Sequence, residues 1–171
     1  STGYQRRVRG KKMEDVRANH LDIDQIRVLF SMMTQHTSSE DSIFNLPVKC
    51  ESEQKMANIL NKYCRSTNTD ISLLPIVIQY IRKISHVEQY CVNTWFRITV
   101  VAFILAQKMM FDTFQGLEFY SFSTYKTSTS QLIVLEKRFL EILDYNIFTY
   151  EDVSSVSPEP SIALFDEKIL Q

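Results

Sequence analysis

Two charged residues stand in apolar surroundings in the second half of the chain. Lys108 lies near the end of a run from Ile98 to Phe111, and nearly all the remaining residues of this run are apolar. Glu136 follows 28 residues later, beside leucine, isoleucine and phenylalanine at helical spacing. Charge-assisted hydrogen bonds are strong at the desolvated centre of a protein interface, so this pattern is typical of a surface that grips another protein. The ordinary alternatives are a lysine that complements a helix C-terminus and a surface glutamate.

The other reactive side chains show no spacing that indicates catalysis or metal binding. The three histidines and three cysteines share no metal-ligand spacing, and no C-x-x-C pair occurs. Three isolated glycines cannot make a phosphate-binding loop, and no Ser–His–acid or Cys–His grouping stands out. We therefore expect a protein that is not an enzyme and holds neither a metal nor a cofactor.

Charge is distributed unevenly along the 171 residues. Five basic side chains lie within residues 1–12, so the other 14 basic residues are outnumbered by 20 acidic ones. We expect a disordered basic arm and no nucleic-acid partner, because the acidic body opposes extended contact with phosphates. Peripheral membrane contact through the arm is the less favoured alternative, and no apolar run is long enough to span a membrane. An odd cysteine count without a secretory signal indicates a reducing compartment, the cytoplasm, the nucleus or both.

Hydrophobic periodicity is helical nearly throughout the chain. It predicts helices over 14–36, from Ser52 to a polar break at 66–70, over 72–89, over 94–112 and over 130–145, with a short helix within 116–125. The expected N-caps are Ser52, Ser72, Asn93 and the run 127–130. The helix over 94–112 is apolar on almost every side, so it must be buried among the others. We expect an all-α bundle.

The ordered residues of this segment resemble a cyclin box, most closely that of the cyclin Y and P-type (U-type) cyclins. The pattern is Asn93-x-Trp95-x-Arg97-Ile98, then Leu105-Ala106-x-Lys108-x-x-x-Asp112, and finally Leu135-Glu136-x-x-Phe139-Leu140-x-x-Leu143-x-Tyr145-Asn146. The resemblance implies a five-helix box over 53–148, preceded by an additional N-terminal helix and loop over 13–52 and followed by a tail over 149–171.

The resemblance also implies a regulatory subunit that binds and activates a cyclin-dependent protein kinase, in particular one of the PCTAIRE class. The helices over 94–112 and 130–145 would be the third and fifth of the box and would pack on the kinase αC helix. Lys108 would then donate to main-chain carbonyls of the kinase, and Glu136 would accept from main-chain N–H groups. The implied apolar contacts are Leu105, Met109, Tyr145 and Ile147. The alternative is a cyclin-fold adaptor that binds a partner without activating a kinase.

One family feature is missing from the helix that begins near Ser52. Cell-cycle cyclins carry there a substrate-docking motif with Met, Arg, an Ile-Leu pair and Trp. In this chain Ala57 replaces the Arg, and Arg82 replaces the acid that pairs with it. Substrate docking on this helix is therefore in doubt, and we expect its apolar members to be core residues: Met56, Ile59, Leu60 and Tyr63.

Overall fold

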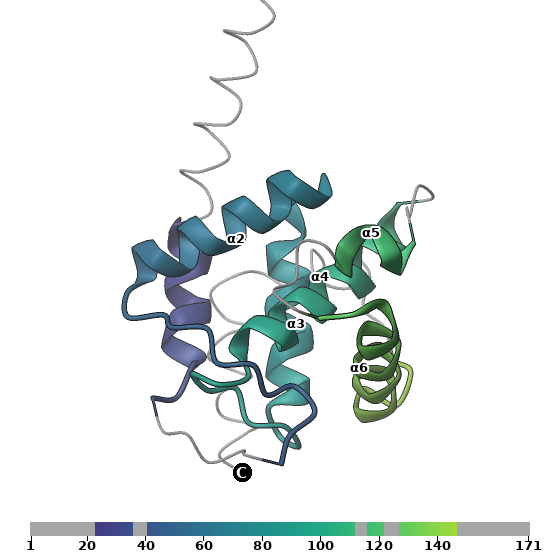
Figure 1. Cartoon of the computed structure of the whole chain (residues 1–171). Helices are drawn as coiled ribbons and strands as arrows, with labels where there is room; N and C mark the ends of the chain where they lie inside the picture. Colours follow the sequence, from purple (N-terminus) through teal and green to yellow (C-terminus); the bar gives the residue numbers. More distant parts are fainter. Residues whose placement is uncertain (1–22, 36–40, 112–115, 122–126, 147–171) are drawn as a thin grey trace, which may run out of the picture.

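The part of the chain that the structure describes consists of helices and the loops that join them, and it contains no β-strand. The computed structural model describes residues 23–35, 41–111, 116–121 and 127–146 (Figure 1). Residues 23–32 are helical. The elements that follow are α2 (Glu53–Thr67), the 3-10 helix η1 (Ile71–Leu73), α3 (Leu74–Ile84), α4 (Trp95–Met110), α5 (Leu117–Ser121) and α6 (Thr129–Ile142). The prediction of an all-α bundle is confirmed.

Helix α4 is the buried centre of the bundle, as its all-round apolar sequence predicts. Its residues from Trp95 to Gln107 are all buried except Arg97. Helices α3 and α6 and the short η1 pack against it. Ala102 and Ala106 are completely buried, and their small side chains let neighbouring elements approach the α4 backbone closely. The exposed or half-exposed positions of α4 are thus confined to Arg97 near its start and to its last turn.

Two predicted helix starts are confirmed by their capping hydrogen bonds. Ser52 caps α2, because its side chain accepts from the backbone N–H of Lys55 at 3.1 Å. Ser128, within the predicted run 127–130, caps α6 through a capping box. Its Oγ accepts from the Gln131 N–H, and the Gln131 side chain accepts in return from the Ser128 N–H. Local sequence signals are sufficient at these two sites.

Two other predicted caps are wrong. Asp70 rather than Ser72 caps the segment before α3: its carboxylate accepts from the Ser72 N–H at 2.9 Å, and one 3-10 turn precedes the α-helix. Thr94 rather than Asn93 is the N-cap of α4, and its side chain makes no capping bond. The Thr94 hydroxyl instead bonds to the residues that precede it in the chain: it donates to the Gln89 carbonyl and accepts from the Cys91 N–H.

Several predicted helices end earlier than their periodicity indicates, including α4, which ends at Met110 and not at 112, and α6, which ends at Ile142 and not at 145. Residues 33–35 are not helical, because Thr34 forms a parallel bridge with Cys91 and exchanges backbone hydrogen bonds with Tyr90 and Val92. Helix α3 ends at Ile84 and not at 89. In the segment that follows α3, backbone groups of Tyr90 and Val92 bond to Thr34, and the Gln89 carbonyl accepts from the Thr94 hydroxyl. These groups would have other partners if the helix continued.

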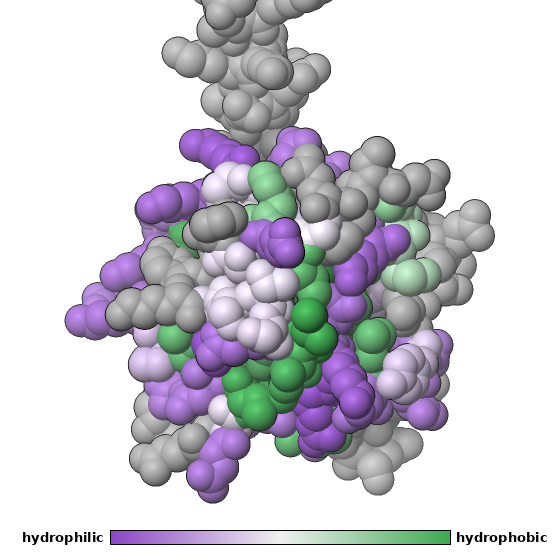
Figure 2. All heavy atoms as spheres, turned by 45° about the vertical axis from the view of Figure 1, so that its right-hand side comes forward, coloured by the Kyte–Doolittle hydropathy of each residue, from purple (hydrophilic) through white to green (hydrophobic). Residues whose placement is uncertain are grey.

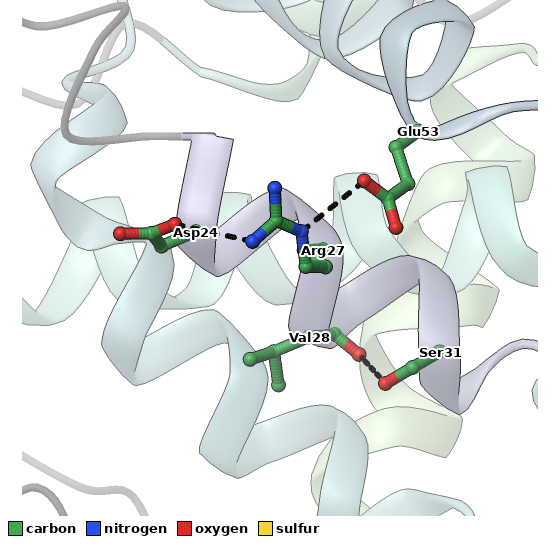
Figure 3. A network of polar contacts seen from close by, with 5 residues as sticks. All are labelled: Asp24, Arg27, Val28, Ser31 and Glu53. Carbon is green, nitrogen blue, oxygen red and sulfur yellow. Dashed lines mark hydrogen bonds and ion pairs between the residues drawn. The ribbon is translucent and has the colours of Figure 1, made fainter.

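Long-range polar contacts attach the N-terminal half to the bundle. Arg27 lies between Asp24 of its own helix and Glu53 at the start of α2, with ion-pair distances of 3.7 Å and 3.4 Å (Figure 3). The Trp95 indole N–H donates to the Val48 carbonyl at 2.8 Å. Arg97 donates to two carbonyls of the loop at 41–50, and burial lowers the pKa of its guanidinium. These contacts fix the loop against the start of α4.

The remaining predictions for the ends of the chain lie outside the described residues. They concern the basic arm at 1–12, the start of the first helix and the tail at 149–171. Among the described residues, no helix is long and apolar enough to cross a membrane.

The capping box of α6 generates a first prediction. Ser128→Ala removes the acceptor for the Gln131 N–H and should lower the free energy of unfolding by about 1 kcal/mol. For a chain of this size that corresponds to a fall in Tm of about 2–4 °C in a thermal melt. Gln131→Ala removes the other bond of the capping box, which the backbone N–H of residue 128 still donates in the Ser128→Ala variant, so it should lower the Tm further in that background. A Ser128→Ala variant that melts at the wild-type temperature would contradict a stabilising cap.

Candidate functional site

Lys108 and Glu136 meet at the boundary between α4 and α6. The Lys108 Nζ donates to both carboxylate oxygens of Glu136, at 2.7 Å to Oε1 and 2.9 Å to Oε2. The lysine side chain is 31% exposed and the glutamate side chain 17% exposed. The two charges that the sequence leaves separate are thus one ion pair at the rim of the core.

The packing of both helices carries the two side chains to this place. Leu105, one turn before Lys108, is buried and holds that face of α4 inward. On α6, Leu135 and Phe139 are buried in the core and leave Glu136 on the flank of the helix. Because the apolar face of each helix is turned toward the core, Lys108 and Glu136 lie at the edges of these faces and point toward each other.

The partial burial of the pair determines what it can do. An ion pair that is exposed contributes little, and one that is buried must overcome a large desolvation penalty. This pair lies between the two limits, and its carboxylate can accept further hydrogen bonds at its remaining lone pairs. The pair therefore places two charged groups, each able to make charge-assisted hydrogen bonds, at the surface next to the exposed Met109 and Ile133.

Apolar side chains surround the pair on both helices. Met109 is 44% exposed, and Ile133, one turn before Glu136, is 53% exposed. Leu140, one turn after Glu136, is half-buried. Figure 2 brings the α5 and α6 side of the molecule forward and shows a hydrophobic band on that face with hydrophilic residues at its borders. We call Lys108, Met109, Ile133, Glu136 and Leu140 the α4–α6 surface.

The end of α6 contributes an exposed aromatic residue in an unusual backbone conformation. Asp144 and Tyr145 have φ angles of 52° and 55°, in the left-handed region that favours glycine. The Tyr145 N–H donates to the Leu140 carbonyl and so closes the helix end. Tyr145 is 62% exposed, and strained positions often serve binding. Ile147, the last predicted contact residue, lies outside the described residues.

Of the other predicted site residues, the structure brings Lys108, Met109 and Glu136 to one surface and buries Leu105 beneath it. Sequence reasoning missed Ile133 and the mutual pairing of Lys108 with Glu136. The spacing of Ile133 three residues before Glu136 is a signal that could have found it, since such residues share a helix face. No local signal reports a pair 28 residues apart.

Nucleophilic and metal-binding groups do not gather near this surface in the described part of the chain. No three His, Cys, Asp or Glu residues are placed there to hold a metal ion. The three cysteines are buried and unpaired by disulfides, and burial raises the pKa of the Cys50 thiol. A raised pKa disfavours the reactive thiolate.

Comparison with known proteins agrees with the all-α architecture. The family model described as Cyclin matches residues 12–147, which is most of the chain. The chain belongs to the cyclin family. A search among curated proteins finds no match. Cyclins are regulatory and not catalytic proteins, and the family implies a kinase partner in general.

The ion pair of this cyclin generates a stability prediction. Lys108→Glu and Glu136→Lys each place two like charges together at a half-buried site, which should lower the free energy of unfolding by about 2 kcal/mol. The corresponding fall in Tm is about 4–8 °C. The double variant Lys108→Glu/Glu136→Lys rebuilds the pair in the opposite sense and should recover most of the loss. A double variant that melts no higher than the single ones would contradict a stabilising pair.

Proposed function

We propose that this cyclin binds a cyclin-dependent protein kinase through its α4–α6 surface and activates it. Helices α4 and α6 would pack on the kinase αC helix and turn it inward, which completes the Lys–Glu ion pair that positions the ATP phosphates. The cyclin supplies geometry and no catalytic group. The observation that carries the proposal is the half-buried Lys108–Glu136 pair within an exposed apolar surface.

The chemistry of this surface suits a helix with an accessible end or an adjoining loop. Main-chain carbonyls there can accept from Lys108, and main-chain N–H groups can donate to Glu136. Met109, Ile133 and Leu140 supply apolar contact area around these polar bonds, and Tyr145 adds an aromatic ring at the end of α6. Removing one partner of such a desolvated charged contact typically costs about 2–5 kcal/mol of binding free energy.

The subfamily assignment extends the proposal. Cell-cycle cyclins have an Arg where this chain has Ala57, and an acidic residue that pairs with it where this chain has Arg82. The loss of both members of this pair supports a cyclin Y or P-type protein and not a cell-cycle cyclin. Its kinase would then be of the PCTAIRE class, and the complex would form in the cytoplasm, the nucleus or both.

Kinase binding by charge variants tests the proposal. Each of Lys108→Glu and Glu136→Lys should weaken binding to a purified PCTAIRE-class kinase by at least thirtyfold, about 2 kcal/mol, and abolish stimulated phosphotransfer. Binding is measured by calorimetry and activity by phosphate transfer to a peptide substrate. The double variant Lys108→Glu/Glu136→Lys separates the effect on stability from the effect on binding. It restores the internal ion pair, but it places a carboxylate opposite the kinase carbonyls and an ammonium group opposite the kinase N–H groups.

Three outcomes of this experiment are informative. Recovery of Tm without recovery of kinase binding supports direct polar contacts from both residues. Full recovery of binding by the double variant would show that the pair serves only the fold and that the proposed contacts are wrong. Binding of the wild-type chain without a rise in phosphotransfer would replace activation by an adaptor role.

The apolar part of the α4–α6 surface generates a separate prediction. Ile133→Asp introduces a charge that must be desolvated when a partner covers the helix, so it should reduce kinase affinity at least tenfold. Val87→Asp is the matched control, because Val87 is 60% exposed but lies in the connection after α3. Both variants should keep the wild-type Tm to within about 2 °C. Equal loss of affinity in both would contradict the location of the interface.

A further inference from the structure

Helix α2 presents a polar outer face that the proposed kinase contact does not use. Its inner face is in the core, with Met56, Leu60 and Tyr63 buried. On the outside, an open groove of about 690 Å³ is lined mainly by polar side chains and by Ile23 at one edge. A second groove of about 440 Å³ lies alongside. The two grooves share Gln54, Asn58 and Lys62, so together they form one continuous surface along the helix.

The charge of this α2 groove is positive. Lys62 and Arg65 line the larger groove and Lys55 the smaller one, and all three side chains are exposed. In the described part of the chain, none of the three is in an ion pair. Amide groups of Gln54, Asn58 and Asn61 also line the larger groove, where Gln54 donates to the Asn58 carbonyl oxygen at 3.0 Å and the N–H groups of Asn58 and Asn61 can donate further hydrogen bonds.

The two acidic residues nearest to Lys55 in sequence already have partners. Glu53 accepts from Arg27, as Figure 3 shows, so its charge is neutralised from the neighbouring helix. Glu51 pairs with Lys49 at 2.8 Å, and this contact lowers the pKa of its carboxyl. The cations of the groove therefore remain available to an external anion.

We propose that the α2 groove docks an acidic peptide segment of a partner protein. Lys62 and Arg65 are one helical turn apart, with Cβ atoms about 5–6 Å from each other. Alternate side chains of an extended peptide are separated by about 7 Å along one side, so two carboxylates can reach both cations. The half-buried Ile59 and the exposed Ile23 offer one apolar contact at each groove. The amide groups can bind the peptide backbone.

The surrounding charge favours a short peptide over a nucleic acid. The chain outside residues 1–12 holds 14 basic and 20 acidic residues, so a long polyanion meets a repulsive field beyond the groove. Lys55 and Arg65 are ten positions apart on the helix, a distance of about 15 Å at about 1.5 Å per residue, and an extended segment of about five residues covers it at about 3.3 Å per residue. The proposal goes beyond kinase binding and uses none of the α4–α6 residues.

Fluorescence anisotropy with the full chain tests the docking site. The probe is a labelled ten-residue peptide of glutamate, aspartate and serine with two isoleucines, and its comparison peptide replaces every acid by lysine. Lys62→Glu should weaken binding of the acidic peptide about three- to tenfold at low salt. Lys137→Glu is the matched control, with the same charge change at another exposed helical lysine, and should change binding less than twofold.

The proposal is overturned if both variants bind the acidic peptide equally, or if the lysine-containing peptide binds as tightly as the acidic one. A single-stranded RNA of ten nucleotides that outcompetes the peptide in wild type but not in Lys62→Glu would also overturn it in favour of nucleic acid. Lys62→Glu should keep both the wild-type Tm and the wild-type kinase affinity. The loss of peptide binding is then distinguishable from a failure of the α4–α6 surface.

Discussion

The enclosure of α4 is the constraint on which the rest of the structure depends. A helix that is apolar on every side is stable in water only when other elements cover it, so α3, α6 and η1 are placed by its surface. The loop at 41–50 is drawn in by the Trp95 indole and by Arg97. Only the last turn of α4 reaches the rim, and there its lysine needs an opposite charge, which α6 supplies through Glu136.

The Lys108–Glu136 pair serves the fold and, in the complex that we propose, would also serve recognition, and single substitutions separate these two roles poorly. Within the chain it joins α4 to α6 at the edge of the core. Toward a partner it keeps ionised groups fixed in an apolar surface, where a loose lysine or glutamate would lose side-chain entropy on binding. The exposed Ile133 and the strained, exposed Tyr145 lie on the same helix or at its end. Their exposure is costly in water and is understandable if a partner covers them.

Helix α2 shows how one helix can lose a family feature and keep its place in the fold. The apolar positions Met56, Leu60 and Tyr63 are buried, and Ile59 is half-buried, as the sequence predicts for core residues. The Arg of cell-cycle cyclins is replaced by Ala57, which lines the larger polar groove. The outer face of α2 is thus basic and amide-rich in this chain, and its chemistry differs from the apolar character of the α4–α6 surface.

The sequence by itself determined the helical class, the burial of α4 and the caps at Ser52 and Ser128, because each depends on periodicity or on contacts within four residues. The family resemblance supplied Lys108, Met109 and Glu136 of the α4–α6 surface as expectations, but neither Ile133 nor Leu140. Asp70 and Ser72 are both competent caps, and only the packing of η1 against α4 distinguishes them. The Thr34–Cys91 bridge and the Lys108–Glu136 pair join residues far apart in the chain. Such pairs are decided by how the helices cross, which no local pattern encodes.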